Sequence, residues 1–169
     1  MKKGILLLIV VFGLSSCLKD VDYPNRPQIE FIEMTLNYGT LSITDSLGIV
    51  SFSFTDGDGN LGLDDATDSD GVFAEGEPYH FNLFIRYFEK RNGVFEEFVI
   101  ENPPLHARFE RLTSAGVGNS IEGRMDAWFG ARPGSPYDTV RYEVYIVDRD
   151  LQHSDTIVTP EVVLSELGF

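Results

Sequence analysis

The stretch IVSFSFTD, from Ile49 to Asp56, alternates apolar side chains with hydroxyl side chains from Val50 to Thr55. Successive side chains of a β-strand point to opposite faces of a sheet, so this alternation predicts a half-buried strand that ends at Asp56. The same alternation recurs in TVRYEVYIVD, from Thr139 to Asp148. No stretch keeps the period of about 3.6 residues that an amphipathic helix requires. The sequence therefore predicts an all-β fold.

Further segments rich in β-branched and aromatic residues lie between turn-forming Gly, Pro, Asn and Asp. They are Gln28–Leu36, Tyr79–Glu89, Val94–Ile100, His106–Leu112, Ser120–Phe129 and Thr156–Leu164. Asn92-Gly93 predicts a tight antiparallel hairpin, because both residues tolerate positive φ angles. Seven to eight antiparallel strands at this spacing predict an immunoglobulin- or fibronectin-like β-sandwich. A jelly roll is the alternative.

The first residues of the chain have the layout of a signal peptide. Lys2 and Lys3 precede an uncharged apolar run, Gly4–Leu14, which is followed by Ser15, Ser16 and Cys17. The run is shorter than the roughly 20 residues that a membrane-spanning helix needs. The tetrapeptide LSSC that ends at Cys17 resembles the lipobox of bacterial lipoproteins. The alternative is an ordinary secretory signal with an incidental cysteine.

The lipobox resemblance implies cleavage before Cys17 and acylation of this residue, which anchors a protein stably when two or more chains are attached. On this interpretation residues 1–16 are a lipoprotein signal peptide, residues 17–27 are the lipidated cysteine and a tether, and residues 28–169 are a single β-sandwich domain. Leu18–Pro27 is polar and contains two prolines, as is typical of a tether. The membrane is then a partner through Cys17, and the location is the cell envelope at the outer membrane, on its periplasmic or surface face.

Composition limits the remaining partners and the ways of stabilising the fold. Loss of residues 1–16 leaves 153 residues with 11 basic and 27 acidic side chains, a net charge of −16. Such a surface repels nucleic acid, so we expect no nucleic-acid partner. Because Cys17 is the sole cysteine, no intramolecular disulfide can form. The domain size is sufficient for one hydrophobic core.

The connection after Asp56 is strongly acidic and begins DGDGNLG. Asp56, Asp58 and Asn60 alternate with glycines, so a tight turn can aim several oxygens at one point. A hard cation such as Ca²⁺ takes about six to eight oxygen ligands. An EF-hand is excluded, because Leu61 stands where the loop needs glycine and Thr67 where it needs glutamate. The alternative is that these residues only form a turn.

A second acidic loop, Asp148–Asp155, joins the last two predicted strands. In an immunoglobulin-like sandwich this loop and the loop after the second strand emerge at the same end. We therefore expect Asp148 and Asp150 to lie near Asp56, Asp58 and Asn60, and these five residues are the candidate ligands for Ca²⁺. Carboxylates so close together repel one another unless a cation or Arg149 lies between them.

The chain resembles a group of uncharacterised Bacteroidetes lipoproteins with an immunoglobulin-like domain. The resemblance lies in the succession of a lipobox, FSFTDGDGNLGL (Phe52–Leu63) and YEVYIVDRDLQHSD (Tyr142–Asp155). In that group the first loop usually reads DGDGDIG and the late motif DRxxNxSN. The chain differs from these motifs at Asn60, Gln152 and Asp155. The resemblance implies a fold and a location, and it brings no activity with it.

The sequence contains no motif that carries a catalytic mechanism. His80, His106 and His153 have neither a catalytic nor a zinc-binding spacing, and Cys17 is committed to lipid, so we do not expect an enzyme. Trp128 shares one face of its predicted strand with charged residues and is expected to point outward, where it could bind a glycan or a protein; the alternative is packing under a loop. The expected function is a lipid-anchored binding or structural module, stabilised by calcium. The alternative is a glycan-binding or glycan-processing accessory protein of the envelope.

Overall fold

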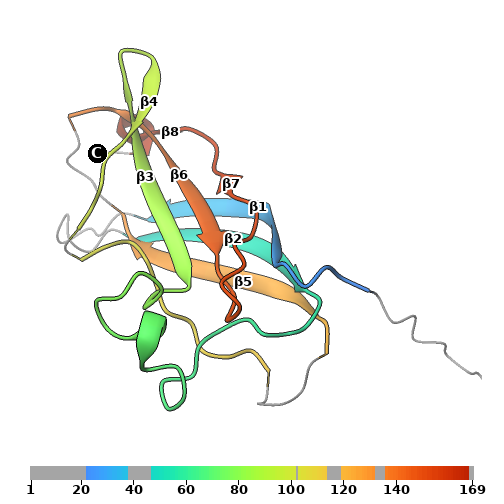
Figure 1. Cartoon of the computed structure of the whole chain (residues 1–169). Coiled ribbons are helices and arrows are strands. Elements are labelled where there is room, and N and C mark those ends of the chain that lie inside the picture. The colour runs from blue at the N-terminus through green and yellow to red at the C-terminus, as the bar shows by residue number, and fades with distance from the viewer. Residues whose placement is uncertain (1–21, 38–46, 102, 114–118, 132–135, 168–169) are drawn as a thin grey trace, which may run out of the picture.

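Two antiparallel sheets face each other in the computed structural model, which describes residues 22–37, 47–101, 103–113, 119–131 and 136–167 (Figure 1). One sheet has three strands in the order β1-β2-β5, namely β1 (Gln28–Asn37), β2 (Leu47–Asp56) and β5 (Ile121–Gly130). The other has five strands in the order β4-β3-β6-β7, with β8 also paired to β6. These are β3 (Leu83–Arg91), β4 (Val94–Glu97), β6 (Thr139–Ile146), β7 (Ile157–Val158) and β8 (Val162–Val163). The predicted all-β sandwich is confirmed.

The strand order follows the immunoglobulin-like pattern and not the jelly roll. The first, second and fifth strands form one sheet, while the third and sixth strands pair in the other, as strands A, B, E and C, F do in immunoglobulin domains. The only helices among the described residues are two short 3₁₀ helices, Gly71–Phe73 and Leu164–Leu167. In this described part, no helix is long and apolar enough to cross a membrane.

The core lies between the sheets and is built from the apolar positions of the alternating strands. Val50 and Phe52 of β2 and Val144 of β6 are completely buried. The Tyr142 ring lies between two others, with ring centroids 4.6 Å from Phe129 and 5.5 Å from Tyr87. Each such side chain contributes about 1.5–3 kcal/mol on burial, so the alternation in the sequence fixes which face of each sheet points inward.

Several predicted strand boundaries are wrong. The strand predicted from Tyr79 begins only at Leu83, because the Asn82 side chain forms two hydrogen bonds to the backbone of Phe109 and ends the preceding turns there. The strand predicted from Thr156 to Leu164 is split into β7 and β8. Between them the Thr159 hydroxyl accepts the Tyr142 N–H at 2.9 Å in place of a backbone carbonyl.

The predicted strand His106–Leu112 does not form. This segment makes only isolated bridges, from Ala107 to Leu83 and from Glu110 to Leu63. The His106 imidazole, and not its backbone, accepts the Ile85 N–H of β3 at 3.2 Å. A side chain thus takes the place of a ladder partner, so the segment crosses the sheet edge without joining it.

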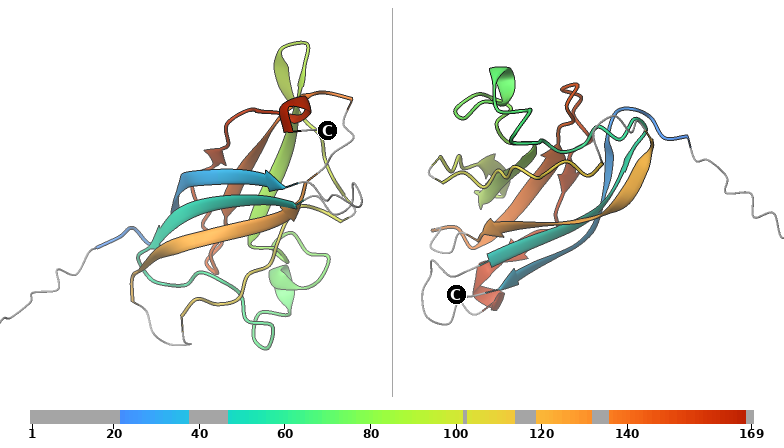
Figure 2. Two further views of the ribbon diagram at one scale, coloured as in Figure 1. Left: turned by 180° about the vertical axis from the view of Figure 1, so that it is seen from behind. Right: turned by 90° about the horizontal axis from the view of Figure 1, so that it is seen from below.

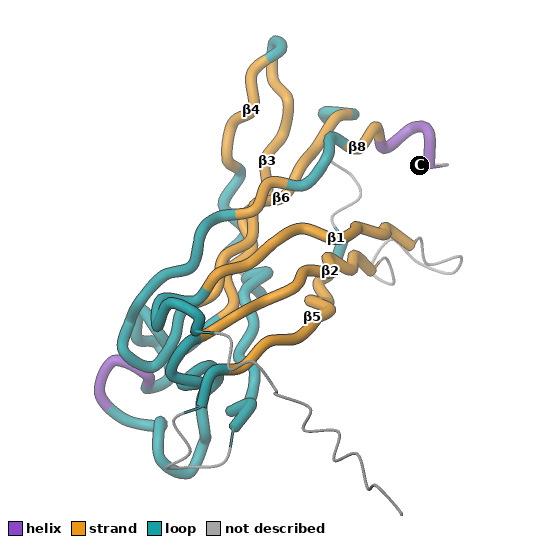
Figure 3. Tube along the Cα trace, turned by 90° about the vertical axis from the view of Figure 1, so that its right-hand side faces the viewer, coloured by secondary structure: helices purple, strands orange, loops and turns teal. Residues whose placement is uncertain are grey.

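The Asn-Gly hairpin is confirmed. Asn92 and Gly93 have φ angles of 51° and 84°, and the register places Arg91 opposite Val94. The β3–β4 hairpin projects from the sandwich at the end opposite to the long acidic connection (Figure 3). The hairpin and the acidic connection therefore lie at opposite ends of the molecule.

Candidate metal centre

The loops that follow β2 and β6 meet at one end of the sandwich, where the N-terminal segment also lies (Figure 2). The Asn60 side-chain amide donates to Asp150 Oδ2 at 3.1 Å and to Asp58 Oδ2 at 3.3 Å. The predicted convergence of the two loops is thereby confirmed. We call the five residues Asp56, Asp58, Asn60, Asp148 and Asp150 the acidic pole.

Two carboxylates form the floor of the acidic pole. Asp56, the last residue of β2, is 0% exposed, and Asp148, two residues beyond β6, is 1% exposed. Both oxygens of Asp56 and Oδ2 of Asp148 are buried without a hydrogen-bond partner, as is Oδ1 of Asn60. Only Oδ1 of Asp148 is satisfied, by the Gln152 N–H at 2.7 Å. An unsatisfied buried acceptor costs about 1–3 kcal/mol, so a cation bound at this floor would stabilise it.

The electrostatic environment makes ionisation of the floor unfavourable. Burial, and then the charges of Asp58 and Asp148, raise the pKa of Asp56 to about 6. Burial, and then the charges of Asp150 and Asp58, raise the pKa of Asp148 to about 6. The Asn60 and Leu61 backbone N–H groups oppose the rise at Asp56, although neither makes a hydrogen bond to its carboxylate. At neutral pH both carboxylates are nevertheless ionised, and the charge of Asp148 reaches Asp56.

No arginine in the described part of the chain compensates these charges. The sequence offers two ways to offset the repulsion between the acidic loops, Arg149 or a bound cation. Arg149 does not serve, because its Nη2 lies 3.1 Å from Asp68 Oδ1. Arg111 also pairs with Asp68, at 3.6 Å. Among the described residues, no Lys, Arg or His forms an ion pair with any carboxylate of the acidic pole. A bound cation is the other way to neutralise the carboxylates of the acidic pole, and this geometry is compatible with it.

Asp68 shows what a compensated carboxylate in the same connection looks like. Burial alone would raise its pKa, but the Asp64 N–H and the Arg149 guanidinium together hold that pKa below its ordinary value. Arg108 adds a hydrogen bond to the Asp68 carbonyl at 2.8 Å. Three arginines therefore fix the middle of the connection, and none reaches its beginning.

Turn chemistry explains part of the first loop. Gly59 has a φ of 65°, and a Cβ at this position would lie 2.2 Å from the Asn119 carbonyl oxygen. The Asp58 carboxylate accepts the Asn60 N–H at 3.4 Å, as a turn-forming aspartate does. Neither feature accounts for the unpartnered oxygens of Asp56 and Asp148, which do not contribute to the turn.

The ligand set of the acidic pole consists of oxygen atoms only, which suits a hard cation. The floor is closed by Asp56 and Asp148, while Asp58 and Asn60 are half-buried and Asp150 is exposed at the rim. Within the described residues, no three Asp, Glu, His or Cys side chains already surround one point as metal ligands. Binding therefore requires Asp58 and Asp150 to turn from the Asn60 amide towards the floor.

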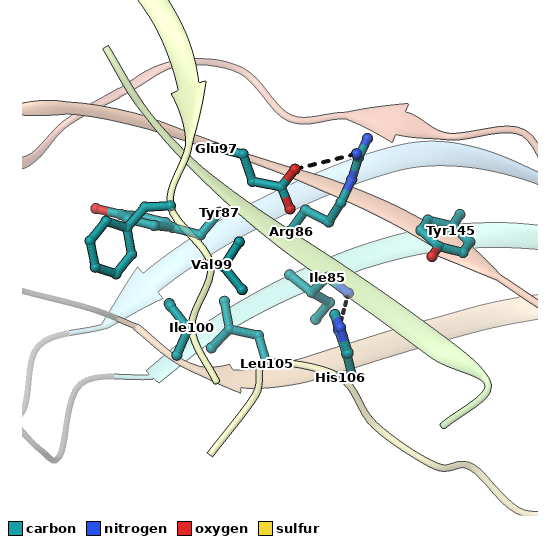
Figure 4. A pocket seen from close by; sticks show the side chains of 10 residues that line it. Ile85, Arg86, Tyr87, Glu97, Val99, Ile100, Leu105, His106 and Tyr145 are labelled. Atoms are coloured by element: carbon teal, nitrogen blue, oxygen red, sulfur yellow. Dashed lines mark hydrogen bonds and ion pairs between the residues drawn. The ribbon is translucent and has the colours of Figure 1, made fainter. Parts of the chain in front are cut away.

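A second candidate is a pocket of about 100 Å³ beside the edge of β3 (Figure 4). Arg86 and Glu97 form an ion pair of 3.6 Å on one side, and His106 and Tyr145 line another. Burial lowers the pKa of His106, so its ring is neutral and accepts the Ile85 N–H. Sequence reasoning missed this pocket because only tertiary contacts assemble it. Its charged groups are paired with each other, unlike those of the acidic pole.

Trp128 points outward, as predicted. Its residue is 58% exposed, on the outer face of the three-stranded sheet opposite Ile49. Trp128 lies seven positions along β5 from Ile121, the partner of Asp56, which corresponds to roughly 23 Å along the strand. Trp128 and the acidic pole are therefore separate sites, and Cys17 lies outside the described residues.

Comparisons of the chain with protein-family models, with curated proteins and with solved structures find no match.

Proposed function

We propose that the protein is a lipid-anchored module of the bacterial cell envelope whose β-sandwich binds Ca²⁺ at the acidic pole and acts in binding or in structure. One observation carries the calcium proposal. Asp56 and Asp148 are both buried, each within reach of the charges of the acidic pole, and together they have three unpartnered carboxylate oxygens, while Arg149 is engaged by Asp68. Buried charges in proteins are normally paired or bound to a metal, so a cation is the missing partner.

Asp56 and Asp148 would hold the ion from below, and Asp58, Asn60 and Asp150 would hold it from the rim. Bound calcium would neutralise the carboxylates and fix the two loops to each other. The role is structural, because residues that are 0% and 1% exposed cannot touch a substrate. The same burial argues against a glycosidase that uses these two carboxylates, since its acid and its base must flank the scissile bond.

A thermal melt tests the calcium site. The chain that begins at residue 17 and carries Cys17→Ser is stripped with EDTA and then melted in calcium or in magnesium. Calcium should raise the melting temperature and magnesium should do so much less, because Mg²⁺ requires a small, regular octahedron of ligands. No rise in calcium would refute the site.

Lipid anchoring is supported by the sequence from Gly4 to Cys17 and by the family resemblance. Cells grown with labelled palmitate should incorporate the label into the wild-type chain and not into Cys17→Ser, which should leave the membrane fraction. Equal labelling of both chains would rule out this residue as the anchor. Protease treatment of intact cells then distinguishes the surface face from the periplasmic face.

Glycan binding is the second candidate function, and exposed Trp128 favours it. Beside it, Asp126 accepts from the Ser51 hydroxyl at 2.6 Å and pairs with Arg124 at 3.1 Å, so an aromatic ring adjoins groups that can bind hydroxyls. A glycan screen of the mature chain should then give ligands that Trp128→Ala loses. Retention of binding by this variant would exclude the surface, and release of product would indicate processing.

A further inference from the structure

We infer that calcium at the acidic pole locks the N-terminal segment Tyr23–Pro27 against the sandwich, so that the ion controls how rigidly the domain is held to its membrane tether. This inference rests on the proposed calcium site and adds its regulation. We call Tyr23–Pro27 the strap. Residues up to Pro27 were predicted to be tether, but the structure shows this last part in contact with the domain, and Pro27 is buried.

The strap is attached to both loops that carry the acidic pole. The Pro24 carbonyl accepts the Gly57 N–H at 2.8 Å, directly beside Asp56. Arg26 donates to the His153 carbonyl at 2.6 Å and pairs with Asp155 at 2.7 Å, in the loop that begins at Asp148. The strap therefore bridges the same two loops that a bound ion would join.

The contact between the strap and the first loop is close. A Cβ on Gly57 would lie 2.1 Å from the Tyr23 carbonyl oxygen and 2.8 Å from the carbonyl carbon of Pro24. Both neighbouring atoms belong to the backbone and cannot move aside as a flexible side chain would. The strap consequently packs directly against the Gly57 backbone, between the proposed ligands Asp56 and Asp58.

The calcium ion and the strap both favour the same arrangement of the two loops, so each should strengthen binding of the other, and this coupling is reciprocal. Calcium should strengthen docking of the strap, and the docked strap should strengthen calcium binding by the same factor. The strap also determines where the tether leaves the domain. Six residues from Cys17 to Tyr23 span at most about 21 Å, so the acidic pole is the end of the domain that stays near the membrane.

Arg26→Ala tests the coupling, with Lys90→Ala as the matched control. Both residues form exposed ion pairs of 2.7 Å, Arg26 with Asp155 and Lys90 with Glu161, but Lys90 lies on β3, which pairs with the projecting β4 hairpin. In the mature chain with Cys17→Ser, Arg26→Ala should weaken calcium binding about fivefold, at the lower end of typical coupling. Lys90→Ala should leave the affinity unchanged.

Hydrogen exchange of the Gly57 amide gives a second readout, because its acceptor is the Pro24 carbonyl of the strap. Calcium should slow this exchange in the wild-type chain, and should slow it less in Arg26→Ala than in Lys90→Ala. If the chain binds no calcium, the proposed site itself is wrong. If it binds calcium with the same affinity and the same Gly57 protection in all three chains, the site stands and the coupling to the strap is refuted.

Discussion

Asp148→Asn should stabilise the protein when calcium is withheld. The substitution keeps an oxygen for the Gln152 N–H and removes a charge from a residue that is 1% exposed. The pKa of Asp148 is raised from 3.8 to about 6, and at about 1.4 kcal/mol per pKa unit the ionised form costs up to about 3 kcal/mol at neutral pH. Access of solvent through the rim reduces this to about 1.5–3 kcal/mol.

The pH dependence has a definite sign. The folded protein holds a proton on Asp148 more tightly than the unfolded chain does, so this residue makes folding less favourable as pH rises from about 4 to about 6. In EDTA at pH 7.5, Asp148→Asn should therefore melt about 3–10 °C above the wild-type chain. At pH 4 the folded wild-type protein is protonated at Asp148 and so carries no charge there, and the difference should nearly vanish.

Differential scanning calorimetry at the two pH values measures this effect, and Asp150→Asn is the control. Asp150 is exposed at the rim, so neutralising it should change stability in EDTA far less. In calcium the order should invert, because the wild-type chain gains from the ion and Asp148→Asn does not. A lower melting temperature of Asp148→Asn in EDTA at pH 7.5, or an equal difference at both pH values, would refute the reasoning.

Three further substitutions test other parts of the structure by thermal or denaturant unfolding. Asp68→Asn should lower the free energy of unfolding by about 2–4 kcal/mol, because Arg149 and Arg111 lose a buried partner. This loss should shrink as pH falls, since the pKa of Asp68 is lowered in the folded protein, and a stabilised variant would contradict the ion-pair assignment. Gly57→Ala should cost about 1–3 kcal/mol through its clash with the strap, whereas Gly130→Ala, with open space around its Cβ, should cost less; equal costs would exclude the clash. Trp128→Ala should change stability by less than about 0.5 kcal/mol, and iodide should quench Trp128, the only tryptophan, in the folded protein; a protected indole would show that the ring is covered.

The sequence predicts the fold well where the alternation of side chains is strong. In Ile49–Asp56 and Thr139–Asp148 the apolar positions are those that face the core, and Asn92-Gly93 forms the expected turn. Prediction fails where a side chain replaces the backbone in a ladder. Neither His106 bound to the Ile85 N–H nor Thr159 bound to the Tyr142 N–H has a local signal, because both contacts join residues far apart in sequence.

The convergence of the two acidic loops was predictable from the sequence, but the environment of each carboxylate was not. Topology alone places the loop of Asp56 beside the loop of Asp150, and the structure brings them together through Asn60. The pairing of Arg149 with Asp68 depends on how the long connection packs against three arginines. The burial of Asp56 and Asp148 likewise depends on tertiary packing. The docking of the strap on Gly57 was likewise hidden, since the composition of this segment is that of a flexible tether.

Isothermal titration of calcium into the metal-stripped mature chain tests the central claim most directly. We predict saturable heat from binding at the acidic pole, with a dissociation constant on the order of 10⁻⁴–10⁻³ M if the site resembles other extracellular calcium modules. Asp56→Asn should abolish this heat while the variant remains folded. Both Asp56 oxygens are buried without a partner, so the substitution removes a calcium ligand and no hydrogen bond within the protein. The absence of saturable heat from the wild-type chain, or equal heat from Asp56→Asn, would contradict a calcium site between these two loops.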